Sequence, residues 1–138
     1  PGLDGQKMSK SYNNTIEIFG DPKETRARIM RIVTDSKGVA DPKDPDACNV
    51  FTLYRLFATP EEREAMAERY RAGGMGYGEA KKALHEKFET HFGPLRAKRE
   101  ALARNLDFVN EVLRKGAERA RAEAAATLRR ARAAMGLD

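Results

Sequence analysis

Residues 47–72, ACNVFTLYRLFATPEEREAMAERYRA, carry the pattern that decides the fold of this 138-residue chain. Apolar side chains recur there at the i, i+3, i+4, i+7 spacing of one helix face: Val50, Leu53, Tyr54 and Phe57. Phe51 and Leu56 widen this face, as expected for a helix that is buried on more than one side. We therefore predict a core helix over residues 47–58, with Cys48 as a small packed residue at its start.

The same stretch predicts a second helix directly after the first. Thr59 is a suitable N-cap, Pro60 suits the first helical position, and Glu62 is placed to close a capping box. The glycines at 73–74 end the helical pattern after Ala72. This helix should bury three side chains: Met66, Ala67 and Tyr70.

The residues before this stretch favour another helix. Asp21 can act as N-cap, Pro22 fits the first helical position, and Glu24 is placed to close a capping box. The pattern continues to about Val33 and offers four residues to a core: Ile29, Met30, Ile32 and Val33. Its arginines are either solvated or directed at a bound nucleotide or an RNA acceptor end: Arg26, Arg28 and Arg31.

The residues after this stretch are also helical in pattern. A helix is predicted over residues 79–92, and Gly93–Pro94 either kinks it or separates it from residues 95–103. The last helix is expected from Asp107, a possible cap, to Met135, with a narrow apolar stripe made mostly of alanines.

These patterns together predict an all-α protein. Residues 15–19 alternate only loosely and could form a short extended piece, and no other segment resembles a strand. We expect a helical bundle over residues 21–138, preceded by a flexible loop and connection over residues 1–20.

Composition favours a soluble globular protein, since 41% of the residues are hydrophobic and 34% are charged. No apolar run approaches the roughly 20 residues that span a bilayer, so no membrane partner is expected. Cys48 is the only cysteine, and neither the two histidines, His85 and His91, nor the aspartates of the polar loop 41–46 have metal-ligand spacing. We expect no metal site, a surface position for that loop, and, without an export leader, a cytoplasmic protein.

The net charge of +5 is concentrated in the second half of the chain. Residues 1–77 carry 12 Lys/Arg and 12 Asp/Glu, whereas residues 78–138 carry 14 and 9. Only Glu118 and Glu123 oppose the basic residues of the last helix, among which Arg129, Arg130 and Arg132 are candidate RNA-binding residues. The alternative is an arginine-rich helix surface that only confers solubility.

A second informative stretch is Gln6-Lys7-Met8-Ser9-Lys10-Ser11, which follows Gly5. It is too polar for a core strand and has no apolar stripe for a helix. Ammonium groups attract phosphate oxygens, and hydroxyl and backbone N–H groups supply further donors. From the residue types alone, this run is either an anion-binding loop or an ordinary solvated loop.

The five residues Lys7-Met8-Ser9-Lys10-Ser11 are identical to the signature pentapeptide of class I aminoacyl-tRNA synthetases. Gly2-Leu3-Asp4-Gly5 before them and Asn14 after them resemble the tryptophanyl and tyrosyl branch of that class. Later stretches resemble the tryptophanyl enzymes in particular: residues 32–36, Asn49, residues 76–81, 113–117 and 134–137. The tyrosyl branch remains the alternative.

The resemblance implies an enzyme that activates tryptophan with ATP and Mg²⁺ and transfers it to tRNA(Trp). Lys7 and Lys10 would be the catalytic residues, binding the β- and γ-phosphates as pyrophosphate leaves. Ser9 and Ser11 would donate to phosphate or hold the loop, and Met8 would contribute backbone contacts near the adenine. The helical part would bind the anticodon, Mg²⁺ would be carried by the ATP phosphates, and the parent enzyme would be a homodimer.

The family's nucleotide-binding fold and tryptophan pocket precede the signature loop, and Pro1 begins this chain just before that loop. We therefore expect a C-terminal fragment that does not activate tryptophan alone. Two other classes remain open: a free-standing helical RNA-binding module whose Lys/Ser loop contacts phosphates, and a helical protein-interaction domain in which the motif is incidental.

Overall fold

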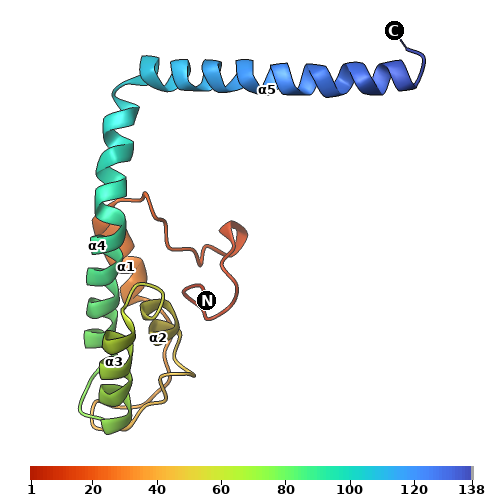
Figure 1. Ribbon diagram of the computed structural model, residues 1–138. Helices are drawn as coiled ribbons and strands as arrows, with labels where there is room; N and C mark the ends of the chain where they lie inside the picture. The colour runs from red at the N-terminus through yellow and green to blue at the C-terminus, as the bar shows by residue number, and fades with distance from the viewer. Residues whose placement is uncertain (138) are drawn as a thin grey trace. The chain divides into compact units, whose positions relative to one another are not determined.

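A computed structural model of the chain describes residues 1–137, and within them it contains helices and no strand (Figure 1). The elements are the 3-10 turn η1 (Lys10–Tyr12) and the helices α1 (Pro22–Met30), α2 (Asn49–Tyr54), α3 (Pro60–Ala72), α4 (Tyr77–Ala103) and α5 (Leu106–Ala134). The prediction of an all-α fold is confirmed. The loosely alternating residues 15–19 form no strand.

Asp21 is the N-cap of α1 and Pro22 its first residue, as predicted, but Glu24 does not close the predicted capping box, and the helix ends earlier than expected. Asp21 Oδ1 accepts hydrogen bonds from the backbone N–H groups of Lys23 and Glu24, at 2.8 and 3.1 Å. The helix ends at Met30, and Val33, which was expected in the core, is 53% exposed. The backbone N–H of Val33 donates instead to the carbonyl of Leu3, at 2.8 Å. The chain therefore leaves the helix early to hold the N-terminal segment.

Helix α2 covers only the middle of the predicted 47–58 helix. After Tyr54 the backbone tightens, since Leu56 N–H donates to the carbonyl of Leu53 and Phe57 N–H to that of Tyr54. A three-residue turn rotates side chains away from their α-helical positions, and Leu56, predicted to be buried, is 66% exposed. Phe57 still packs against Phe88 and Phe92 of α4, with ring centroids 5.9 and 5.6 Å apart.

Helices α3 and α4 run side by side in opposite directions (Figure 1). Glu62 near the start of α3 pairs with Lys87 of α4, whereas Arg69 near its end pairs with Glu79 at the start of α4. The capping box of Thr59 is present as predicted. The buried residues of α3 are also those predicted: Met66, Ala67 and Tyr70. Helix α4 starts two residues earlier than expected and continues through Pro94 without a break.

By its internal contacts the chain divides into one compact unit over Pro1–Arg96 and a second that starts at Ala97. The first unit holds the hydrophobic core, to which every helix from α1 to α4 contributes; its most deeply buried side chains are Ile29, Ile32, Val50, Tyr70, Met75 and Leu84. The segment 1–20 belongs to this compact unit. Whether residues 21–138 act as one functional domain, as predicted from the sequence, stays a prediction.

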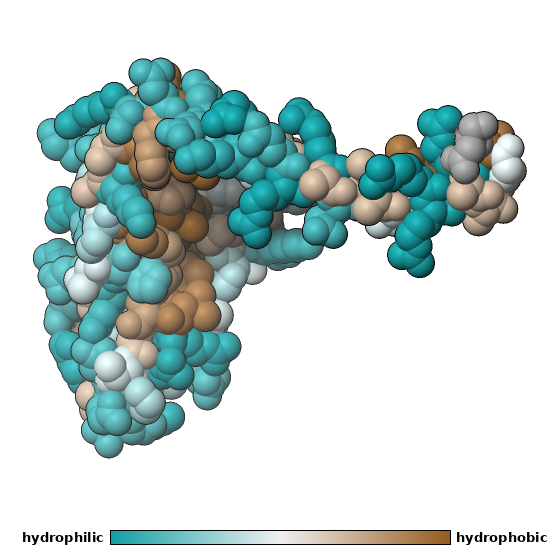
Figure 2. Space-filling model, turned by 45° about the horizontal axis from the view of Figure 1, so that its top comes forward, coloured by the Kyte–Doolittle hydropathy of each residue, from teal (hydrophilic) through white to brown (hydrophobic). Residues whose placement is uncertain are grey.

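Helix α5 has no buried residue in this chain. Its N-cap is Asn105, whose Oδ1 accepts the N–H of Phe108 at 3.2 Å. The predicted cap, Asp107, lies in the first turn instead. Hydrophilic side chains cover much of the α5 surface with apolar ones between them (Figure 2). The residues of the predicted alanine-rich stripe are therefore not buried within the described part of the chain.

The polar loop 41–46 was predicted to lie on the surface, and Lys43 is an exception. It is only 3% exposed, and its ammonium donates to the carbonyls of Gly38 and Asp41 at 2.6 and 2.9 Å. The ammonium also lies 5.4 Å from the centroid of the Tyr77 ring. Backbone carbonyls replace the water around this charge, which allows the aliphatic part of the side chain to be buried.

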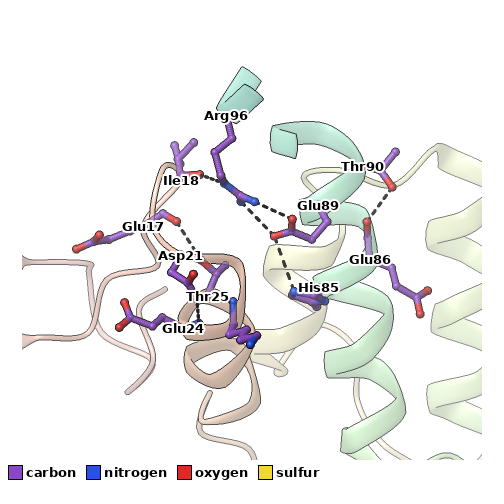
Figure 3. A network of polar contacts seen from close by, with 11 residues as sticks. Glu17, Ile18, Asp21, Glu24, Thr25, His85, Glu86, Glu89, Thr90 and Arg96 are labelled. Atoms are coloured by element: carbon purple, nitrogen blue, oxygen red, sulfur yellow. Dashed lines mark hydrogen bonds and ion pairs between the residues drawn. The ribbon is translucent and has the colours of Figure 1, made fainter. Parts of the chain in front are cut away.

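A buried arginine joins α4 to the segment before α1 (Figure 3). Arg96 donates to both carboxylate oxygens of Glu89, at 2.8 and 3.1 Å, and its Nε donates to the carbonyl of Ile18 at 3.4 Å. His85 lies on the other side of Glu89, with its Nε2 3.8 Å from the carboxylate. The hydrogen bonds from Arg96 hold the pKa of Glu89 below its usual value, against the opposing effect of burial.

We expect Arg96→Ala to lower the free energy of unfolding at pH 7 by about 2 kcal/mol, because it leaves a half-buried carboxylate without its main partner. Since the folded-state pKa of Glu89 is depressed, its contribution is complete above the unfolded pKa and is lost as the pH falls through the folded value. The difference between wild type and variant should therefore shrink in acid. Urea unfolding at several pH values measures it, with the exposed Lys98→Ala as control. A difference that is constant down to acid pH would contradict this account.

Candidate functional site

The Lys7–Ser11 loop exposes both of its cations. Lys7 and Lys10 are exposed, and among residues 1–137 neither ammonium has a hydrogen-bond or ion-pair partner. Lys10 also begins the turn η1, which ends at Asn13 in the left-handed conformation with φ 50°. Two unpaired ammonium groups, three residues apart in one loop, are available to an external anion.

The two serines of the loop interact with each other. Ser9 Oγ and Ser11 Oγ lie 2.7 Å apart, so one hydroxyl donates to the other. The acceptor hydroxyl keeps its own proton available for a further hydrogen bond. Ser9 is half-buried and Ser11 is exposed, which leaves the pair accessible from solvent.

Met8 has a different environment from the residues around it. Its side chain is half-buried, packs against the hydrophobic core, and lines an apolar hollow of about 170 Å³ together with residues of α1 and α4, including Ile29 and Leu84. Its predicted backbone contacts near an adenine stay a prediction. The observed role of the side chain is to attach the loop to the helices.

The buried amide of Asn14 ties the loop together. Only 3% of Asn14 is exposed; its Nδ2 donates to Asp4 Oδ1 at 2.8 Å and to the carbonyl of Lys7 at 3.1 Å. Its Oδ1 accepts the backbone N–H of Ser9 at 2.8 Å. The hydrogen bond from Asn14, helped by the backbone N–H of Gln6, lowers the pKa of the Asp4 carboxyl and keeps it an acceptor. The backbone on both sides of Met8 is thus held by one side chain.

Arg28 of α1 reaches the residues that follow the loop. Its Nη1 donates to the carbonyls of Asn13 and Thr15, at 3.2 and 3.1 Å, and its Nη2 donates to Asn13 Oδ1 at 2.7 Å. Of the three arginines of this region, Arg28 is therefore engaged within the chain. Arg26 and Arg31 are exposed and have no partner among the described residues.

The sequence pattern located the loop, but it did not show that Asn14 and Arg28 hold the loop backbone by hydrogen bonds. Asn14 was noted only as part of the flanking pattern, and Arg28 only as one of three arginines. An asparagine seven residues after the lysine whose carbonyl it binds leaves no periodic signal. Arg28 likewise leaves no periodic signal, because its hydrogen-bond partners Asn13 and Thr15 precede it by 15 and 13 positions.

The chemistry available at this loop is the binding of an anion by electrostatic attraction and hydrogen bonding. Lys7 and Lys10 supply charge, and hydroxyl and backbone groups supply donors. Among residues 1–137, no group of three or more His, Cys, Asp or Glu side chains could hold a metal ion.

The three candidate RNA-binding arginines lie on exposed turns of α5. Arg129 and Arg130 have no partner among the described residues, whereas Arg132 donates from Nε and Nη2 to the carbonyl of Leu137, at 3.2 and 3.0 Å. Glu111, which was not counted against the basic surface, pairs with Lys115. None of the helices in the described part of the chain is both long and apolar enough to cross a membrane.

Comparison with known proteins gives consistent results. The family of class I tRNA synthetases (W and Y) matches residues 1–93. The chain is 58% identical over 137 residues to the tryptophan–tRNA ligase of Rhodopirellula baltica and 42% identical to that of Fusobacterium nucleatum, covering 99% of this chain in each case. It spans 43% and 42% of the length of these two relatives.

A solved structure is also similar to nearly the whole of this chain. The tryptophanyl-tRNA synthetase of Campylobacter jejuni, complexed with ADP and tryptophan, superposes with a TM-score of 0.90 at 39% identity. The match covers 99% of this chain and 43% of that protein.

Proposed function

The chain belongs to the class I tRNA synthetases of the tryptophan and tyrosine branch, and we propose that it forms the C-terminal part of a tryptophan–tRNA ligase. The observation that carries the proposal is the Lys7–Ser11 loop with two unpaired lysines, in a chain that is 58% identical to a tryptophan–tRNA ligase. The reaction joins tryptophan to ATP, releases pyrophosphate, and then transfers the amino acid to tRNA(Trp). The tyrosyl branch is less favoured, because the relatives named above are tryptophan enzymes.

In this proposal the loop binds the triphosphate. Lys7 and Lys10 contact the β- and γ-phosphates and stabilise the negative charge that develops as pyrophosphate leaves. The free hydroxyl of the Ser9–Ser11 pair and the backbone N–H groups of the loop add donors. Mg²⁺ is carried by the phosphate oxygens. The protein supplies position and charge and forms no covalent intermediate.

Tryptophan-dependent exchange of pyrophosphate into ATP tests the proposal. We expect exchange from the longer protein that carries this sequence, with tyrosine unable to replace tryptophan. The 138-residue chain alone should show none, because it spans only 43% of the length of the tryptophan–tRNA ligase of Rhodopirellula baltica. Near-normal exchange from the chain alone, or exchange that depends on tyrosine, would refute the proposal in this form. No exchange with either amino acid would favour a non-enzymatic RNA-binding module.

We further propose that the helical part binds tRNA(Trp), with α5 contributing a basic surface that contacts phosphates. Replacing Arg129, Arg130 and Arg132 together by glutamine should weaken tRNA binding and make its dependence on salt shallower, by about 2 in the slope of log K against log salt. Filter binding at several salt concentrations measures both quantities. The matched control is Arg114→Gln with Lys115→Gln, since these side chains are already paired with Glu118 and Glu111.

If the triple variant binds tRNA with wild-type affinity and slope, those arginines only solubilise the helix and the anticodon is contacted elsewhere. Dimerisation of the longer enzyme and a cytoplasmic location stay predictions from the sequence. Sedimentation of the longer protein tests the first of these.

A further inference from the structure

Two residues outside the signature pentapeptide determine the backbone shape of the Lys7–Ser11 loop. We call Asn14 and Arg28 together the loop brace. Asn14 holds the carbonyl of Lys7 and the N–H of Ser9, which lie on either side of Met8. These two hydrogen bonds fix the backbone around Met8, next to Lys7. Because the side chain of Lys7 starts from that backbone, they also limit the positions that its ammonium group can occupy.

Arg28 holds the other end of the loop. Its guanidinium, on α1, donates three hydrogen bonds to Asn13 and Thr15. These residues flank Asn14 directly. Asn13 is also the left-handed residue that ends η1, in which Lys10 lies. The position of Lys10 therefore depends on a conformation that Arg28 stabilises.

We propose that the loop brace positions Lys7 and Lys10 for the triphosphate, an inference that rests on the proposed function. Neither Asn14 nor Arg28 needs to contact ATP. Asn14 is buried, and three of the five N–H donors of Arg28 already bind Asn13 and Thr15. Both act through the lysines and are positioning residues.

The geometry requires these residue types. The planar guanidinium presents donors in a fixed fork that reaches two carbonyls and an amide oxygen at once, which a single ammonium cannot do with the same geometry. Aspartate at position 14 would keep the acceptor for Ser9 N–H but lose both donors. It would also place a second carboxylate beside Asp4, which now accepts from the Asn14 amide.

The test compares Arg28→Lys, Arg28→Gln and Asn14→Asp in the longer synthetase. Each is expected to lower kcat/KM for ATP in pyrophosphate exchange by about tenfold or more, mainly through kcat, because displaced lysines lose stabilisation of the transition state. The KM for tryptophan should stay within twofold. Arg26→Gln is the matched control on the same helix, because Arg26 is exposed and has no partner among the described residues.

A second readout does not need activity. Amide hydrogen exchange of Ser9, followed by NMR in the 138-residue chain, should be faster in Arg28→Gln and in Asn14→Ala, which removes the acceptor of the Ser9 N–H, than in wild type and Arg26→Gln, while core amides such as that of Tyr70 keep their rates. Wild-type ATP kinetics in the Arg28 variants, or equal losses for ATP and tryptophan, would overturn the inference. An unchanged Ser9 rate would also overturn it. Absence of tryptophan-dependent exchange in the wild type would instead refute the proposed function.

Discussion

Replacing Lys10 by alanine in the longer synthetase is expected to slow tryptophan-dependent ATP–pyrophosphate exchange by about 10²–10³-fold, the range seen when one preorganised electrostatic donor is removed. The ammonium of Lys10 is exposed and unpaired within the described chain, so its removal leaves no internal partner unsatisfied. The loss should therefore fall on the step in which charge develops on pyrophosphate. The KM for tryptophan should stay within twofold, and steady-state exchange kinetics separate these effects.

The matched control is Lys23→Ala, which removes an exposed and unpaired lysine from the first turn of α1. It should leave the exchange rate unchanged. If Lys10→Ala weakens tryptophan binding as much as it slows exchange, Lys10 has a structural role and the proposed contact with the triphosphate is wrong.

The largest effect on stability is expected at Gly73, which ends α3 with φ 76°. A Cβ there would lie 2.4 Å from the carbonyl oxygen of Ala40, a backbone atom that cannot rotate away as a side chain could. Gly73→Ala therefore combines the strain of a positive-φ conformation that is essentially restricted to glycine, about 1–3 kcal/mol, with a clash against backbone. We expect a loss of about 3 kcal/mol or more in the free energy of unfolding, measured by urea denaturation of the 138-residue chain.

Gly74 provides a control with a similar positive φ and no clash. Its φ is 79°, and a Cβ there would meet nothing within 4 Å. Gly74→Ala should thus cost only the conformational strain, about 1–2 kcal/mol. If both variants lower the free energy of unfolding by the same amount, the close approach of the Ala40 carbonyl to Gly73 does not contribute to the loss in Gly73→Ala.

Much of the candidate site was predictable because its signal is carried by consecutive residues. The Lys7–Ser11 loop is recognisable from its own residue types, and the unpaired state of Lys7 and Lys10 agrees with an anion-binding loop. The brace was not predictable in the same way. Arg26, Arg28 and Arg31 have the same chemistry in sequence, and only the packing of α1 beside residues 13–15 selects Arg28.

The sequence by itself determined the helical class and the starts of α1 and α3. The caps at Asp21 and Thr59 and the buried face of α3 follow from interactions within four residues, so local spacing is sufficient to predict them. It also determined the presence of the signature loop and its two cations.

Only the tertiary structure decided where α1 and α2 end and which polar groups are buried. Helix α1 stops at Met30, and Val33 then binds the distant Leu3, while Lys43 is buried because carbonyls of its own loop surround its ammonium. The shape of the Lys7–Ser11 loop likewise depends on Asn14 and on Arg28 from α1. Such contacts join residues that are far apart in sequence or have no periodic spacing, and their free energy appears only once the chain has folded around them.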